Sequence, residues 1–244
     1  MLKYYPSGES GEQIQPPTPL QPNAVGSDGV PQPLLRMELR DLRHGATKVF
    51  LNNFQPTDDV TMLISTVLEW LYEGHVPPVR SIMMVIRDMD GVAYTTGIDI
   101  DPQHHKEIDF SLSYIQHVAK SSPDPAAIRK ELLGVICHEL VHCWQYDGQG
   151  TAPGGLIEGV ADWVRLNAGY VPPHWGKDCQ GDWHKGYQTT AYFLDWVEKQ
   201  QGKGSVRRIN EKLRVSKYDE KTFWPELFKK DVKTMWDAYC KSIQ

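Results

Sequence analysis

The stretch GVICHELVHCWQYDGQG, residues 134–150, carries two histidines four positions apart, with a glutamate directly after the first. On an α-helix, positions four apart differ by about 40° in direction and by one turn in height, so His138 and His142 point the same way. Two imidazoles on one helical face are good ligands for zinc. Glu139 lies about 100° further round the helix, beside such an ion rather than on it. The spacing therefore predicts a metal-binding helix in which Glu139 can take a proton from water.

The alternative is a helix that carries two histidines by coincidence, which chance produces in about 2 of 100 chains of this composition. A metal site also needs a third ligand and a partner that orients a ligand. The segment GGLIEGVADWVR, residues 154–165, has Glu158 and Asp162 on one face of a predicted helix. Two acids on an otherwise apolar stripe are costly to bury without a cation. We therefore expect Glu158 to bind zinc and Asp162 to accept the free ring N–H of a ligating histidine, with a solvated acidic face as the alternative.

Other residues are weaker candidates for the site. A third histidine six residues after His142 is excluded, because Gly148 stands there. His174 and His184 remain as fallback ligands, although histidines in loops are usually exposed. Tyr187 is the first candidate for a donor to the oxyanion of a hydrolysis reaction, and His184 is the second. For Tyr187 the alternative is packing at the start of a helix.

Two further aromatic and histidine pairs come from loops. Trp175 and Trp183, before the helix of residues 184–202, are candidates for the wall of a cleft, whereas the tryptophans on helices are interpreted as core. The pair His104-His105 is interpreted as a loop feature.

The segments before the motif predict mostly strands. Alternating apolar residues predict a strand in LLRMELRDL, residues 34–42. The other predicted elements are a short strand in KVFLNNF (48–54), a helix (57–74), two strands around a turn at Asp90-Gly91 (81–97), and a strand in EIDFSLSYI (107–115).

Helices are predicted for the rest of the chain. Asp124 as N-cap and Pro125 at the first helical position begin the helix of the motif, and Asp231 caps the last helix. The helices between them are predicted within residues 151–169, 184–202 and 205–215. Strands followed by helices indicate an α+β fold. We expect a Pro-, Gly-, Ser- and Gln-rich tail over residues 1–33, a sheet with the motif helix over 34–148, and a helical subdomain over 149–244.

Composition excludes several classes of protein. The net charge of -5 argues against a nucleic-acid binder, and no apolar run of about 18 residues exists to span a membrane. The N-terminal segment has no apolar run typical of a secretory signal, so the sequence favours a cytoplasmic location or a signal already removed. Cys137 and Cys143 lie about 9 Å apart along one helix and cannot bridge each other there. We expect reduced thiols, with a Cys179–Cys240 disulfide as the alternative.

The segment GVICHELVHCWQYDGQGTAPGGLIEGVADWVRLNAGY, residues 134–170, resembles the plant basic secretory protein family, a group of zinc peptidases also found in fungi and bacteria. DMDGVAYTTG, FSLSYI, PPHWGKDCQGDWHKGYQTTAYFLDWVE and MWDAYCKS resemble it too, so the resemblance extends over residues 34–243. It implies a zincin-like α+β fold of the glutamate-zincin type, with a mixed sheet above the active-site helix and a helical lower half. In zincins the strand that borders the cleft pairs with an extended substrate, and EIDFSLSYI is similarly placed.

The resemblance also implies roles for the residues of the site. His138, His142 and Glu158 hold zinc, Glu139 is the general base, and Asp162 supports a ligand. The expected activity is hydrolysis of peptide bonds in a peptide or protein substrate by a monomeric metallopeptidase. The alternatives are a binding or defence protein that keeps the zinc fold without turnover, and a zinc hydrolase of a non-peptide amide or ester. The acidic charge and the lack of a visible signal depart from the family's name.

Overall fold

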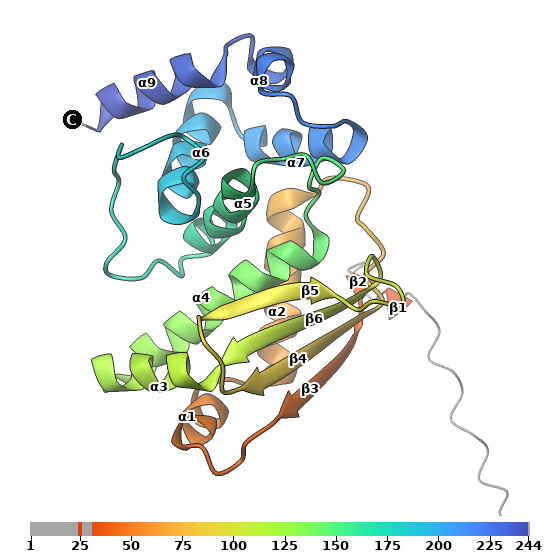
Figure 1. Ribbon diagram of the computed structural model, residues 1–244, viewed down its shortest axis with the longest axis vertical. Coiled ribbons are helices and arrows are strands. Elements are labelled where there is room, and N and C mark those ends of the chain that lie inside the picture. The colour runs from red at the N-terminus through yellow and green to blue at the C-terminus, as the bar shows by residue number, and fades with distance from the viewer. Residues whose placement is uncertain (1–23, 26–30, 244) are drawn as a thin grey trace, which may run out of the picture.

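A four-stranded mixed sheet forms one half of the computed structural model, which describes residues 24–25 and 31–243 (Figure 1). Its strands are β3 (Leu34–Leu39), β4 (Ser81–Arg87), β5 (Ala93–Gly97) and β6 (His105–Ser111), in the order β3-β4-β6-β5. Strands β3, β4 and β6 run parallel to one another, and β5 runs antiparallel to β6 at the edge of the sheet. Two short strands, β1 (Ala24–Val25) and β2 (Pro31–Gln32), pair separately, and the rest of the predicted tail, within residues 1–33, is outside the described residues except for Pro33.

Helices pack on one face of this sheet. They are α1 (Gly45–Asn53), α2 (Pro56–Leu71) and α4 (Pro125–Trp144), with α3 (Leu112–Ser121) against α1 and α4. The alternate strand residues that face them, such as Ile82, Ile86 and Phe110, are fully buried. The burial of this strand face packs α4 against β5 and β6.

Helix α4 is buried on nearly all sides. Its start is fixed by Asp124, whose side chain accepts a hydrogen bond from the Ala126 N–H, and by Pro125 at the first position. From Leu132 to Val141 every residue is buried, because the sheet covers one side of the helix and a second layer of helices covers the other. A helix that is apolar all round belongs inside a domain, so the few polar side chains on it are held away from bulk water.

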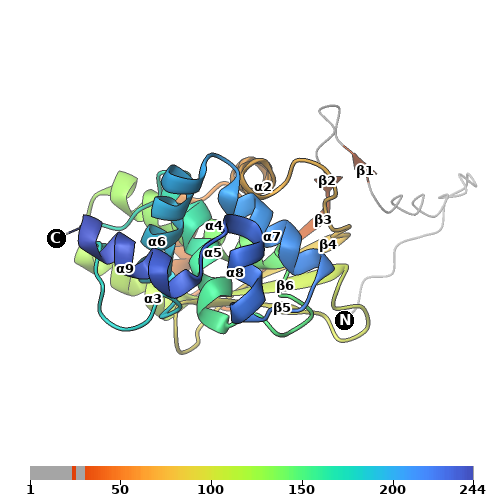
Figure 2. The ribbon, with the colours of Figure 1, turned by 90° about the horizontal axis from the view of Figure 1, so that it is seen from above.

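The second half of the described chain consists of helices. They are α5 (Gly154–Asn167), α6 (Tyr187–Gln201), α7 (Ser205–Val215), α8 (Glu220–Phe228) and α9 (Val232–Ser242). Seen from above, α8 and α9 lie over the other helices (Figure 2). Their core is aromatic, with Trp183, Trp224 and Trp236 around Phe193. No helix in the described part of the chain combines the length and the apolar character needed to cross a membrane.

Two glycines let α5 and the start of α6 approach each other closely. A Cβ atom on Gly155 would lie 1.7 Å from the carbonyl oxygen of His184, and one on Gly159 would lie 2.2 Å from Thr190 Cγ2. The loop that reaches this contact turns through Gly186, which has a φ of 94°. Only residues without a side chain permit this separation, so the two glycines set where α6 begins.

The sheet differs from the sequence prediction in three places. KVFLNNF is not a strand but part of α1, since Ala46 and Phe50 bury one helical face and His44 caps the helix. EIDFSLSYI is a strand only to Ser111, after which α3 begins. The strands on either side of Asp90-Gly91 are confirmed, but they are not neighbours, because β6 lies between them. The edge strand of the sheet is therefore β5 and not β6.

The cysteine and tryptophan predictions were wrong in part. Cys179 and Cys240 form a disulfide, with Cα atoms 5.7 Å apart, that ties the loop before α6 to α9. Cys137 and Cys143 are free and buried, as expected. Trp183 does not line a cleft; it is buried in the aromatic core of the C-terminal helices. Helix α8 was not predicted from the sequence.

Candidate metal centre

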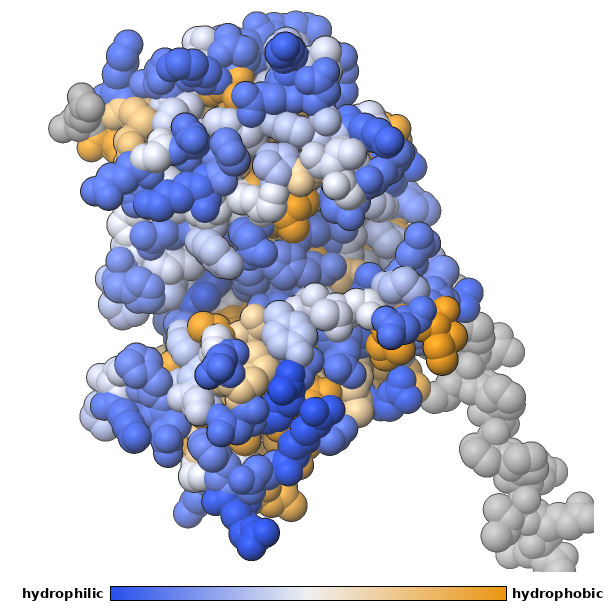
Figure 3. Space-filling model, viewed as in Figure 1, coloured by the Kyte–Doolittle hydropathy of each residue, from blue (hydrophilic) through white to orange (hydrophobic). Residues whose placement is uncertain are grey.

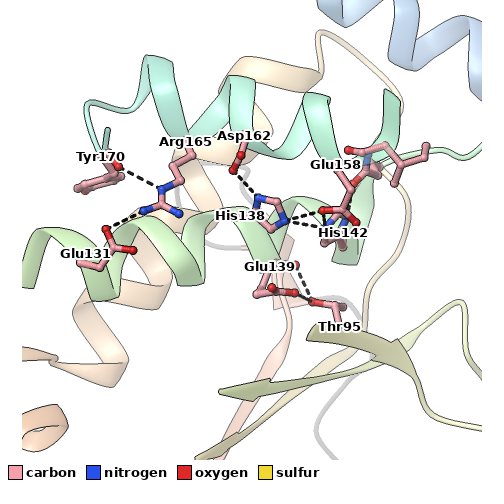
Figure 4. A network of polar contacts seen from close by, with 11 residues as sticks. Thr95, Glu131, His138, Glu139, His142, Glu158, Asp162, Arg165 and Tyr170 are labelled. Carbon is pink, nitrogen blue, oxygen red and sulfur yellow. Dashed lines mark hydrogen bonds and ion pairs between the residues drawn. The ribbon is translucent and has the colours of Figure 1, made fainter. Parts of the chain in front are cut away.

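Helices α4 and α5 bring three predicted ligands to one point. The Nε2 atoms of His138 and His142 lie 3.1 Å apart, and Glu158 Oε2 lies 3.1 Å from the first and 3.6 Å from the second (Figure 4). These three residues, the ligand triad, form the only group of three or more potential metal-binding side chains among the described residues. The chain segments that carry them are 20 residues apart, so the convergence depends on how the two helices pack.

The hydrogen bonds of the two histidine rings favour the tautomers that can bind a cation through Nε2. His138 Nδ1 lies 2.6 Å from Asp162 Oδ1, and His142 Nδ1 lies 2.5 Å from Gln145 Oε1. The Gln145 amide in turn donates to the carbonyl of Ile157, which fixes the orientation of its oxygen. With a hydrogen on each Nδ1, both Nε2 lone pairs face the Glu158 carboxylate.

The spacing of the triad fits a zinc ion. Zinc–ligand bonds are about 2.0–2.1 Å long, and tetrahedral geometry then separates the ligand atoms by about 3.3 Å. The observed separations of 3.1 to 3.6 Å bracket that value. Three lone pairs that converge this closely repel one another unless a cation or a proton lies between them.

Hydrogen bonds within the site shift the pKa values of His138 and Glu158 against the effect of burial. Burial alone would lower the pKa of His138, but its hydrogen bonds to Asp162 and Glu158 outweigh burial and raise that pKa to about 10. Burial would raise the pKa of Glu158, but the hydrogen bonds from His138 and His142 hold it well below its usual range. Both shifts show that the carboxylates around the two rings favour positive charge at this point between the helices.

Glu139 lies beside the triad and does not join it. Its side chain is buried, and its Oε2 atom lies 2.7 Å from the hydroxyl of Thr95 on β5. This contact joins β5, at the edge of the sheet, to α4 (Figure 4). The sequence gives no indication that Thr95 contacts Glu139, since the two residues are 44 positions apart.

Tyr187 covers the triad from the start of α6. Its ring is stacked on that of His138, with centroids 6.2 Å apart and planes 12° apart. The side chain is 59% exposed, and the residue has a positive φ of 47°. The charge of Glu158, followed by burial, raises the pKa of its hydroxyl, which therefore stays a hydrogen-bond donor. A non-glycine residue in this left-handed region is strained, which marks the position as one that the surrounding contacts impose.

His184 and His174 lie away from the triad. The His184 ring packs against Trp183, and its Nδ1 atom is buried without a hydrogen-bond partner in the described chain. His184 is not among the residues that line the cleft, whereas His174 is. His104 pairs with Asp101, and His105 contacts Ser81 at the start of β4, so neither histidine reaches the site.

A third pair of charges continues the contact between α4 and α5. Arg165 donates to Glu131 at 2.8 Å and to the carbonyl of Tyr170 at 3.1 Å, and Tyr114 donates to the other oxygen of Glu131. The guanidinium also lies over the ring of Trp175. The pair was not predicted, although the sequence indicates it: Arg165 shares a helical face with Asp162, and Glu131 lies two turns before His138.

A cleft of about 1060 Å³ passes over the triad. One wall is β5 with the turn before it, the floor is α4, and the other wall is α5 with the loop and first turn of α6. The space-filling view shows the hollow between the helical half and the sheet half (Figure 3). The cleft extends past the triad in both directions, toward Trp175 at one end and Lys106 at the other, so it suits an elongated molecule.

Comparison with known proteins places the chain in a family. A family model described as peptidase of plants and bacteria (BSP) matches residues 32–239. Comparisons with curated proteins and with solved structures returned no match. The matched residues run from β2 to α9 and include the triad, Glu139 and the whole cleft. The chain therefore belongs to the BSP family, the peptidases of plants and bacteria that its sequence resembles.

Proposed function

We propose that this protein is a zinc-dependent metallopeptidase with a zincin-like fold of the glutamate-zincin type, acting on a peptide or protein substrate. The observation that carries the proposal is the meeting of two imidazole nitrogens and one carboxylate oxygen within 3.6 Å of one another, with a buried glutamate beside them. Two nitrogen ligands and one oxygen ligand form a donor set that zinc prefers, and three protein ligands leave a position open in a tetrahedral site.

The ligand triad would hold the ion, and Asp162 and Gln145 would fix the two imidazole rings through their Nδ1 atoms. A bound zinc ion supplies a Lewis acid that polarises a carbonyl group and lowers the pKa of water toward about 7. Asp162 is buried, and its contact with His138 Nδ1 makes that ring a better electron donor at Nε2.

Glu139 is the proposed general base. One of its oxygens is occupied by the Thr95 hydroxyl, and the other is available to accept the proton of the attacking water. The protonated carboxyl group can then deliver that proton to the nitrogen of the leaving amine. Tyr187, with its exposed hydroxyl above the triad, is the proposed donor to the oxygen that becomes negative in the transition state.

The edge of the sheet supports an extended substrate. The Ser111 N–H donates to the Val92 carbonyl, and the Ile98 N–H donates to the His105 carbonyl. Hydrogen bonding alternates along an antiparallel strand, so the backbone groups of Ala93, Thr95 and Gly97 point to the open edge. A peptide can add there as a further strand. Antiparallel pairing would run it from the Gly97 end toward Ala93, so residues after the scissile bond would lie toward Trp175.

The test combines metal analysis with peptide cleavage. We expect one zinc per wild-type chain, and its loss in His142→Ala and in Glu158→Ala. Glu139→Gln should keep the zinc and lose hydrolysis by a factor of about 10²–10⁴, since it removes the base but no ligand. Glu226→Gln, the same change at an exposed residue of α8, is the matched control and should leave both properties unchanged.

Two results would contradict the proposal. Full zinc affinity in Glu158→Ala would remove the third ligand from the site. Wild-type activity in Glu139→Gln would remove the base. A zinc-loaded wild-type protein that cleaves nothing in a broad peptide library would favour the zinc-binding protein without turnover, and cleavage of small amides alone would favour the non-peptide hydrolase.

A further inference from the structure

The hydroxyl of Thr95 makes an unusual double contact with one residue of α4. Its Oγ1 atom lies 2.7 Å from Glu139 Oε2 and 3.0 Å from the main-chain oxygen of Glu139. A threonine hydroxyl carries one hydrogen, so it donates to one of these oxygens at a time. The ionised carboxylate is the stronger acceptor, and the main-chain oxygen lies inside a helix that already bonds it. The hydrogen therefore belongs to the carboxylate in the ionised state.

This hydrogen bond determines the orientation of the carboxylate. Glu139 is 5% exposed, and within the described chain its side chain has no other hydrogen-bond partner. The glutamate side chain has three rotatable bonds, and burial limits its position without fixing the rotation of the carboxylate plane. Donation from Thr95 occupies Oε2 and leaves Oε1 for the cleft.

We propose that Thr95 is a positioning residue whose hydroxyl holds the base Glu139 and couples its orientation to the binding of substrate on β5. The inference rests on the proposed function, because it takes Glu139 as the base. Nothing in the sequence motif assigns a role to Thr95.

The coupling follows because the side chain of Thr95 contacts Glu139 while its backbone lies at the open edge of the sheet. The Thr95 side chain points to α4, whereas its backbone N–H and carbonyl groups are among those at the open edge of β5. A β-branched side chain has few χ1 rotamers, so the hydroxyl moves with the backbone. A peptide that pairs with the edge therefore restrains Thr95 and, through it, Glu139.

The experiment compares Thr95→Val, which keeps the shape and removes the hydroxyl, with Thr95→Ser, which keeps the hydroxyl. We expect kcat to fall about 10- to 100-fold in Thr95→Val, as for a lost hydrogen bond to a charged group, with KM changed less than about twofold. Thr95→Ser should recover most of kcat. Thr96→Val is the matched control, since the neighbouring side chain is exposed on the opposite face of the strand. Zinc content should be the same in all three variants.

A second measurement needs no catalysis. In the metal-free protein, Thr95→Val should lower the denaturant midpoint of unfolding, and this effect should vanish in a Glu139→Ala background, since the partner is then absent. Equal effects in both backgrounds would overturn the inference. So would a kcat within about twofold of wild type in Thr95→Val, or a Thr95→Ser variant as slow as Thr95→Val. These results would leave the zinc and Glu139→Gln tests untouched, whereas full activity in Glu139→Gln would refute the proposed function itself.

Discussion

Two neighbouring glycines at the start of α5 should respond in opposite ways to the same substitution. In Gly155→Ala the new Cβ atom would lie 1.7 Å from the carbonyl oxygen of His184 and 3.0 Å from the backbone nitrogen of Gly186. Those are backbone atoms of the loop that leads into Tyr187. In Gly154→Ala the new Cβ atom meets nothing within 4 Å. The two variants therefore share chemistry and helix position and differ only in the space available.

The size of the difference follows from the distances. An ordinary van der Waals separation is about 3.5 Å, so the His184 carbonyl has to move by about 1.8 Å in Gly155→Ala. Overpacking of this kind costs about 1–3 kcal/mol or more, and backbone yields less readily than a side-chain end. Alanine regains at most about 0.5–1 kcal/mol through its helix propensity. We expect Gly155→Ala to be about 2 kcal/mol less stable than wild type, or about 4–8 °C lower in Tm, and Gly154→Ala to be equal or slightly more stable.

Denaturant unfolding of the two variants measures this difference, and peptide cleavage measures its consequence. Displacement of Gly186 moves Tyr187 away from the triad, so Gly155→Ala should also lose catalytic rate while it retains zinc. If Gly155→Ala unfolds at the same denaturant concentration as Gly154→Ala, the close approach of α5 and α6 does not exist as described.

Three further results are expected. Asp162→Asn should weaken zinc affinity about 10- to 100-fold in a chelator competition, because the amide supports the His138 ring less well; unchanged affinity would show that the contact is dispensable. Thiol titration without reductant should find no reactive thiol in the folded protein at pH 8, because burial raises the pKa of Cys137 to about 12 and Cys143 is also buried. It should find two thiols after unfolding, and four thiols after unfolding would exclude the disulfide. Arg165→Met should cost about 3–5 kcal/mol of unfolding free energy, since it removes the guanidinium partner of Glu131, whose side chain is only 15% exposed. Less loss is expected when Glu131→Gln accompanies it; additive losses would show that the two side chains are not coupled.

The helix of the motif was predictable because its information is local. Two histidines four apart, an aspartate cap and a proline at the first position all act within one helix, and the structure has that helix from Pro125 to Trp144. The second helix was predictable for the same reason. The sheet order was not, because Asp90-Gly91 suits a hairpin equally well. The strand order depends on β6, whose apolar residues pair with β4, so that β5 is left at the edge of the sheet.

KVFLNNF failed for a related reason. Seven residues are too few to separate a period of 2 from a period of 3.6. In the structure Leu51 is 49% exposed, while Phe50 is fully buried together with Ala46, four residues earlier. The tertiary partner of the segment, not its own pattern, decides which apolar residues are buried.

The candidate site has the same division between local and tertiary information. The polar side chains of α4 that contact α5 are at positions 131, 138 and 142, and their partners on α5 are at 165, 162 and 158, so antiparallel packing matches them in three facing pairs. The step from His138 to His142 on α4 and the step from Glu158 to Asp162 on α5 are both four residues, which allows the short distances within the triad. The outer steps, seven residues on α4 and three on α5, differ by about 6 Å of helix rise, and the long side chains of Arg165 and Glu131 bridge that difference. Each helix's spacing is written in the sequence, but the register between the helices is set by contacts such as Gly159 against Thr190, and only the structure contains those.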